Sequence, residues 1–197
     1  MWWSRMHGAR LILADPDEAT RREIREAVQR YGYLVVGSVG DGRSAAQLIF
    51  QREPEAAVIS WQLPLRSGLE VARVVEEQMV CAVVLTAEEL NWFVLEEARE
   101  AGVQALLPKP LTEQVLIPAL EIAISTFRRY REVALQNRKL REELETRRLV
   151  ERAKGLLMQT RGWSEAEAYA FLRRASMNRG LPLRRVARAV LEGHLGT

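Results

Sequence analysis

The sequence predicts an α/β fold: a doubly wound, five-stranded parallel sheet, then a long coiled-coil helix and a small C-terminal three-helix module. Three observations predict it. Short apolar runs alternate with amphipathic segments over residues 9–125, as in parallel sheets that helices cover on both faces. Residues 112–159 contain a single proline, Pro118, and no glycine before Gly155, which favours one long helix. Short amphipathic segments separated by turn residues close the chain.

The elements of the first part follow from hydrophobic periodicity and turn residues. Apolar runs bounded by Gly, Pro or Asp are expected to be strands, at residues 10–14, 33–37, 56–59, 81–85 and 103–107. Segments with apolar residues at helical spacing are expected to be helices, at residues 18–31, 43–52, 69–78 and 91–102. In such sheets the chemistry lies beyond the carboxyl ends of the strands, so functional side chains are expected there.

The long helix is expected to run from residue 112 to about residue 159, with Pro118 near its start. After residue 127 its apolar residues alternate at spacings of three and four, as in a coiled-coil seam. The predicted seam positions are Tyr130, Val133, Asn137, Leu140 and Leu144. Asn137 falls at an a-type position, where a buried Asn favours a parallel pair in fixed register. The alternative is that this stripe packs against the chain's own domains.

Caps and periodicity predict the C-terminal module. Ser164 and Glu167 form a capping box for a second helix, which is expected to end near Met177. Pro182 suits the first position of a third helix. Gly155 is expected to allow close approach of another helix. The predicted core residues are Leu157, Met158, Ala168, Leu172, Ala175, Met177, Leu183, Val186, Ala187, Val190 and Leu191.

Charge divides the chain into an acidic front and a basic back. Residues 1–127 hold 12 Lys and Arg against 18 Asp and Glu, a net charge of −6. Residues 128–197 hold 17 against 8, a net charge of +9. This asymmetry favours a polyanionic partner at the C-terminal end. The alternative is a solvated, charged helix surface.

Composition narrows the class of protein. No uncharged apolar stretch approaches the ~20 residues of a membrane helix, and the start lacks an apolar signal core. The single cysteine, Cys81, excludes an intrachain disulfide. We therefore expect a cytoplasmic protein. We find no nucleophile triad, metal-ligand cluster or phosphate-binding Gly-rich loop, and His7 and His194 lie in the tails. Neither an enzyme nor a cofactor or metal is expected.

The residues after the predicted strands carry a first resemblance: Asp15, Thr86-Ala87, Lys109-Pro110 and the spacing Ser60-x-x-x-Pro64-x-x-x-Gly68. Over roughly residues 9–125 this pattern resembles a response-regulator receiver domain. The resemblance implies a switch in which an aspartate accepts a phosphoryl group. Neighbouring carboxylates in that family hold the Mg²⁺ ion that neutralises the incoming charge.

Three departures from the family pattern speak against that switch. Pro16 stands at the second acid position, Ser60 at the phosphate-accepting position and Leu106 at the aromatic switch position. A hydroxyl cannot form an aspartyl phosphate, and a hard cation needs several oxygen ligands. We therefore expect no aspartyl phosphorylation and a domain that serves docking or dimerisation.

A remnant of the pocket is expected around Ser60, formed by Asp15, Asp17, Thr86 and Lys109. Lys109 is expected to pair with Asp15, and Trp61 is expected to cover the site. The alternatives are that Ser60 is itself modified, or that Asp15 and Asp17 recruit a metal ion.

A second resemblance lies in the basic end. Its motifs are Arg152-Ala153-Lys154-Gly155-Leu156-Leu157-Met158, Gly162-Trp163-Ser164-Glu165-x-Glu167-Ala168, Leu172-Arg173-Arg174-Ala175-Ser176-Met177 and Val186-Ala187. Over about residues 147–192 they resemble the ANTAR domain, the RNA-binding module of transcription antitermination regulators. The resemblance implies a dimer that binds two small stem-loops of nascent messenger RNA. Binding would stabilise an antiterminator and keep the terminator hairpin from forming.

The charge of this module supports RNA binding independently, because residues 147–190 hold 11 Lys and Arg against 3 Glu, a net charge of +8. The expected RNA contacts are Lys154, Arg174 and Arg179 first, then Arg152, Arg161, Arg173, Asn178, Arg184, Arg185 and Tyr169. For each arginine the alternative is a solvated surface position. Tyr169 is either a core residue or a stacking platform for a base.

The expected partners are messenger RNA leader stem-loops and a second copy of the chain. Control by a regulatory protein partner, a small ligand or protein abundance stays open. So do two other functions, a DNA-binding regulator and a protein-interaction adaptor. DNA is disfavoured because the turn at Gly162 is tight and no recognition helix stands out. The expected domains are an extension at 1–8, the receiver-like domain at 9–125, the coiled coil at 126–148 and the RNA-binding domain at 149–193.

Overall fold

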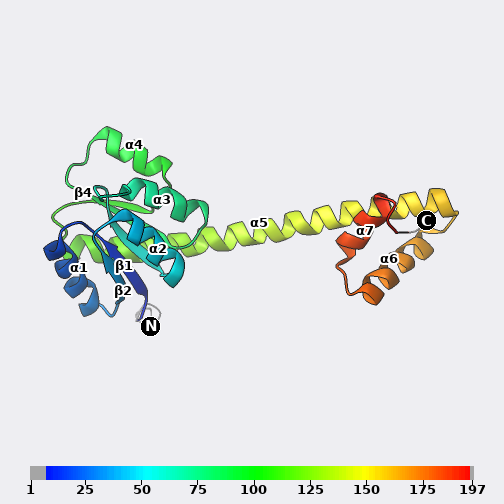
Figure 1. The fold of residues 1–197 in the computed structure, drawn as a ribbon, viewed down its shortest axis with the longest axis horizontal. Helices are drawn as coiled ribbons and strands as arrows, with labels where there is room; N and C mark the ends of the chain where they lie inside the picture. The colour runs from blue at the N-terminus through cyan, green and yellow to red at the C-terminus, as the bar shows by residue number, and fades with distance from the viewer. Residues whose placement is uncertain (1–7, 196–197) are drawn as a thin grey trace. The chain divides into compact units, whose positions relative to one another are not determined.

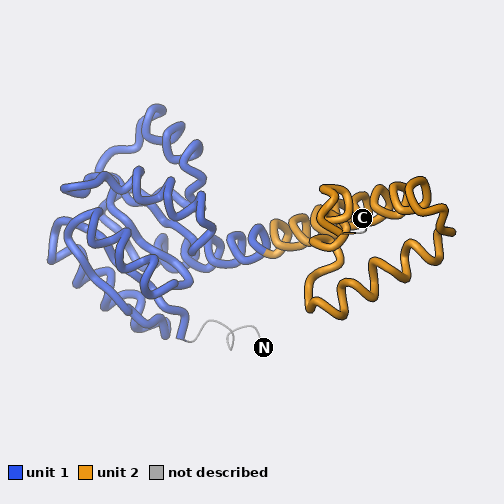
Figure 2. The backbone as a smooth tube through the Cα atoms, turned by 45° about the vertical axis from the view of Figure 1, so that its right-hand side comes forward, with its two compact units in different colours: residues 1–131 blue, residues 132–197 orange. Residues whose placement is uncertain are grey.

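The structure is a computed structural model that describes residues 8–195 (Figure 1). The chain divides into two compact units, residues 1–131 and residues 132–197 (Figure 2). His7 and all but the last residue of the expected N-terminal extension lie outside the described residues.

The first unit contains a five-stranded sheet with the strand order β2-β1-β3-β4-β5, in which every pairing is parallel. The strands are β1 (Arg10–Ala14), β2 (Leu34–Val39), β3 (Ala56–Ser60), β4 (Ala82–Ala87) and β5 (Ala105–Pro108). The predicted fold class is confirmed. β3 and β4 are buried at every residue, as continuous apolar runs predict for the centre of a parallel sheet. Their register places Ser60 beside Thr86.

Helices cover both faces of this sheet (Figure 1). One face packs against α1 (Glu18–Arg30) and the first turns of α5 (Glu113–Arg161). The other packs against α2 (Gly42–Arg52), α3 (Gly68–Glu77) and α4 (Trp92–Glu100). Asp17, Asp41, Ser67 and Asn91 cap the amino ends of α1 to α4 by accepting backbone N–H groups.

The predicted long helix is α5, and Pro118 lies inside its second turn. The apolar seam residues Tyr130, Val133, Leu140 and Leu144 are between 54% and 59% exposed. The Asn137 amide donates to the Val133 carbonyl of the same helix, at 3.3 Å. The dimer seam therefore stays a prediction. The apolar side chains that would form it are exposed in the single chain. No helix in residues 8–195 combines the length and the hydropathy needed to cross a membrane.

In the second unit, α6 (Glu165–Arg179) and α7 (Leu183–Leu191) pack against the end of α5. The shared core contains Val150, Ala153, Leu157, Ala168, Leu172, Val186, Ala187 and Val190. The predicted Ser164–Glu167 capping box is present. α6 runs two residues beyond the expected end, and Gly180 ends it with a left-handed backbone at φ 62°.

Three expectations for this unit are wrong. Met177 is 75% exposed and Met158 is also exposed, although both were expected in the core. At 100° per residue Met177 lies well off the α6 face that carries Ala168 and Leu172, so hydrophobicity alone misplaced it. A Cβ on Gly155 would meet nothing within 4 Å, so no other element approaches the helix there.

The backbone after β3 approaches Gly68, the first residue of α3, closely. A Cβ on Gly68 would lie 2.0 Å from the Ser60 carbonyl oxygen. We expect Gly68→Ala to lower the free energy of unfolding by about 1–3 kcal/mol, since the backbone must shift. Urea unfolding measures the change. Gly155→Ala is the matched control, and it should raise stability by up to about 1 kcal/mol because alanine favours helix. Equal stabilities of wild type and Gly68→Ala would contradict the close approach.

Candidate nucleic-acid interface and the pocket at the sheet edge

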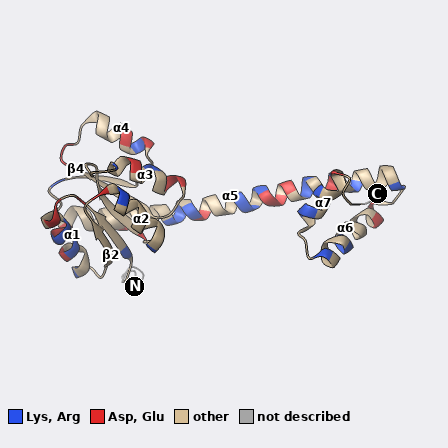
Figure 3. Ribbon diagram, viewed as in Figure 1, with Lys and Arg blue, Asp and Glu red and all other residues tan. Residues whose placement is uncertain are grey.

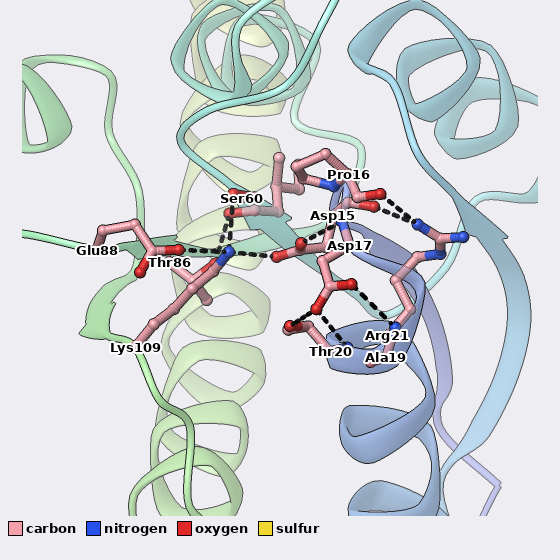
Figure 4. Close-up of polar contacts among 11 residues, drawn as sticks. Asp15, Pro16, Asp17, Ala19, Thr20, Arg21, Ser60, Thr86, Glu88 and Lys109 are labelled. Carbon is pink, nitrogen blue, oxygen red and sulfur yellow. Dashed lines mark hydrogen bonds and ion pairs between the residues drawn. The ribbon is translucent and has the colours of Figure 1, made fainter.

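Side chains at the carboxyl ends of β1, β3 and β5 meet at Lys109, where the remnant of the receiver pocket was expected (Figure 4). Its ammonium nitrogen lies 2.7 Å from Asp15 Oδ2, 3.3 Å from Ser60 Oγ and 3.3 Å from Glu88 Oε1. The expected Lys109–Asp15 ion pair is present. Asp15 is only 2% exposed, so its charge depends on this partner and on the Asp17 backbone N–H that its Oδ1 accepts at 3.0 Å.

Asp17 does not point its carboxylate at the pocket but uses it as the amino-terminal cap of α1. It accepts the backbone N–H groups of Ala19 and Thr20, at 3.2 Å and 3.1 Å, and the Thr20 hydroxyl at 2.6 Å. The Thr20 hydroxyl, followed by these N–H groups, lowers the pKa of Asp17. Pro16 offers no side-chain oxygen, and its carbonyl accepts from Arg21 at 3.2 Å.

This donor set does not suit the Mg²⁺ ion of the receiver family. One carboxylate is already neutralised by Lys109, the other caps a helix, and the third position is the hydroxyl of Ser60. Within residues 8–195 no group of three or more His, Cys, Asp or Glu residues could hold a metal ion. The alternative that Asp15 and Asp17 recruit a metal is therefore not supported.

The other residues around Lys109 are buried or partly buried and are held by contacts within the first unit. Ser60 is buried and accepts from Lys109, so it is not exposed for modification. Thr86 is buried too, and its hydroxyl donates to the Ile59 carbonyl at 3.5 Å. Trp61 and Leu106 are partly buried and pack against the apolar core of the sheet. Burial likewise raises the pKa of the Cys81 thiol to about 12, which makes it an inert core residue.

Lysines and arginines are frequent along α5, α6 and α7 of the second unit (Figure 3). Five of the predicted contact arginines are exposed and form no ion pair within the described residues: Arg152, Arg173, Arg174, Arg179 and Arg185. Arg173 and Arg174 share the exposed side of α6 with Met177, and Asn178 and Arg179 follow at its carboxyl end. This exposed row is the part of the predicted contact set that the structure leaves open to a polyanion.

Two other predicted contacts, Arg184 and Arg161, are engaged within the unit. Arg184 lies 3.5 Å from Glu145, which also pairs with Arg188 at 3.2 Å. Arg161 has its guanidinium 6.0 Å from the centre of the Trp163 ring. These residues are therefore tied to neighbours on the module itself.

Lys154, placed first among the expected contacts, is 7% exposed and lies between two carboxylates. Its ammonium nitrogen is 2.6 Å from Glu165 Oε1 and 2.9 Å from Glu151 Oε2. The hydrogen bond that Lys154 donates to Glu165, followed by the one that it donates to Glu151, raises the pKa of Lys154. The same bond to Lys154 lowers the pKa of Glu165. The pairing of Lys154 with Glu165 could not be predicted from the sequence, because Glu165 lies eleven residues away on another helix.

Tyr169 is 41% exposed, which excludes the core position and leaves the stacking platform of its two alternatives. It lines a groove of about 1100 Å³ between the end of α5, α6 and the start of α7. Lys154, Glu165, Arg147 and Arg185 line the same groove. An aromatic surface, a buried cation and carboxylates are therefore brought together from α5 and α6.

Comparison with known proteins yields matches to both units. The chain matches the family "Response regulator receiver domain" over residues 11–121 and the family "ANTAR domain" over residues 138–191. It is 36% identical over 188 residues to the "Transcriptional regulatory protein PdtaR" of Mycobacterium tuberculosis, covering 95% of this chain and 91% of that protein. It is 33% identical over 112 residues to the "Response regulator MprA" of Mycolicibacterium vanbaalenii, covering 55% and 47%.

Solved structures resemble the first unit. The signal receiver domain of the putative response regulator NarL from Mycobacterium tuberculosis superposes with a TM-score of 0.58 at 22% identity, covering 60% of this chain and 98% of that one. The chemotaxis response regulator CheY4 of Vibrio cholerae gives a TM-score of 0.54 at 20% identity, covering 58% and 97%. At these identities the likeness concerns the fold alone.

Proposed function

Because this chain belongs to the response regulators that join a receiver domain to an ANTAR domain, we propose that it is an RNA-binding transcription antiterminator. The observation that carries the proposal is the row of exposed arginines without ion pairs on α6, among the described residues. Phosphate neutralisation by such a row supplies affinity and strong salt dependence. Sequence choice in RNA comes from unpaired loop bases, which exposed side chains on α6 can contact.

In this proposal the chain acts in the cytoplasm as a homodimer. The coiled coil over residues 126–148 joins two copies, and each copy presents one RNA-binding domain, residues 149–193. Two domains held together bind two stem-loops of one leader transcript with a raised effective concentration. The bound RNA is thereby held in the antiterminator structure.

The experiment that tests this function is ultraviolet crosslinking in cells, followed by sequencing of the bound RNA. We expect enrichment of leader transcripts in which two adjacent stem-loops overlap a terminator hairpin. Enrichment of double-stranded DNA in a parallel chromatin precipitation, with no RNA enriched, would replace the proposal by a DNA-binding regulator. Absence of both would leave a protein-interaction adaptor.

We also propose that the receiver-like domain is not switched by aspartyl phosphorylation. Incubation with acetyl phosphate and Mg²⁺ is expected to leave no hydroxylamine-labile phosphate, since Ser60 holds the acceptor position and Lys109 neutralises Asp15. Intact-mass spectrometry measures the label. The matched variant Pro16→Asp/Ser60→Asp restores both missing carboxylates and is expected to become labelled. Labelling of Asp15 or Asp17 in the wild type would contradict the proposal.

A further inference from the structure

The groove lined by Lys154, Glu165 and Tyr169, hereafter the α5–α6 groove, differs chemically from the arginine row on α6. Its cation is nine-tenths buried and already touches two carboxylates, Glu151 and Glu165. A phosphate entering here would meet negative charge at hydrogen-bonding distance, and this repulsion disfavours it. A neutral ligand with both donors and acceptors suits such a mixed site.

The arrangement of the groove matches a flat ring with a polar edge. Glu165 and Tyr169 are four residues apart on α6, so they lie on the same side of that helix. Lys154 faces them from α5, with its ammonium nitrogen 2.6 Å from Glu165 Oε1. The partly exposed ring of Tyr169 offers a surface on which a base can stack. A carboxylate acceptor and an ammonium donor therefore lie side by side in the groove that Tyr169 also lines.

We propose that the α5–α6 groove binds one unpaired guanine of an RNA loop. Its ring stacks on Tyr169, its N1–H and 2-amino groups donate to the Glu165 carboxylate, and its O6 accepts from Lys154. Guanine is favoured because two donors lie next to one acceptor on its Watson–Crick edge. Adenine and cytosine offer the carboxylate one amino group, and uracil offers it one N–H. The inference rests on the proposed function, and in it the α5–α6 groove recognises one base of the RNA.

The experiment uses the full-length protein and a hairpin library with a fixed stem and a randomised loop. The tightest-binding hairpin is selected, and each loop guanine is replaced in turn by inosine, which lacks the 2-amino group. For wild-type protein we expect one replacement to weaken binding about tenfold, as loss of a hydrogen bond to a charged group does. Glu165→Gln is expected to bind the guanine hairpin more weakly and to lose much less on the same replacement.

Glu151→Gln is the matched control, because Glu151 also contacts Lys154 but is assigned no contact with the base. It should retain the full inosine effect. A loop without a sensitive guanine, or an equal inosine effect in wild type and Glu165→Gln, overturns the inference while leaving RNA binding in place. Failure of the wild type to select any hairpin overturns the proposed function, and the inference with it.

Discussion

Replacing Arg173 and Arg174 together by glutamate is expected to weaken binding to a two-stem-loop leader RNA by about a hundredfold near physiological salt. Both side chains are exposed on α6, and neither forms an ion pair in the part of the chain that the structure describes. Neither belongs to the core of the module, so the fold is expected to persist. Fluorescence anisotropy across a salt series measures the affinity, and the salt slope should fall by about one for each lost phosphate contact.

The control for total charge is Arg22→Glu/Arg43→Glu, which changes the net charge equally but alters exposed residues of the first unit. It should leave the affinity within about twofold, because screening at this ionic strength limits charges to a range of about 8 Å. Sedimentation should report the same oligomeric state for both variants. Equal losses of affinity in the two variants would mean that net charge, and not the α6 surface, attracts RNA.

Replacing Lys109 by methionine is expected to lower the free energy of unfolding by about 3 kcal/mol. Methionine keeps much of the length of lysine but leaves the Asp15 carboxylate buried without its cation. The remaining partner of Asp15, the Asp17 backbone N–H, supplies one hydrogen bond but no charge. Urea unfolding measures the loss, and RNA affinity should not change, because Lys109 lies in the first unit and is not among the assigned RNA contacts.

The double variant Asp15→Asn/Lys109→Met tests whether the loss comes from the uncompensated charge. It is expected to regain most of the stability, because the neutral amide of asparagine costs much less to bury than a lone carboxylate. If the loss of stability in the double variant equals the sum of the losses in the two single variants, Asp15 and Lys109 do not interact. A Lys109→Met variant as stable as the wild type would show that solvent, not Lys109, supports the charge of Asp15.

The sheet, the long helix and the helices of the second unit were predictable because they depend on local patterns. Continuous apolar runs marked the central strands, and the Ser164–Glu167 spacing marked the start of α6. The Lys109–Asp15 pair was predictable as well, since both residues follow strands of one parallel sheet whose carboxyl ends meet at the same edge. The motifs of both families also lie in short contiguous stretches.

The environments of side chains between packed helices could be seen only in the tertiary structure. The sequence showed Lys154 as a cation in a basic stretch, whereas contact between α5 and α6 buries it between Glu151 and Glu165. Met177 was expected in the core but is 75% exposed, and Tyr169, for which a core position was one of two alternatives, lines the groove instead. The physical reason is that periodicity states which residues share a helix face. Which of those faces meets another helix is set by three-dimensional packing, and this packing created the groove.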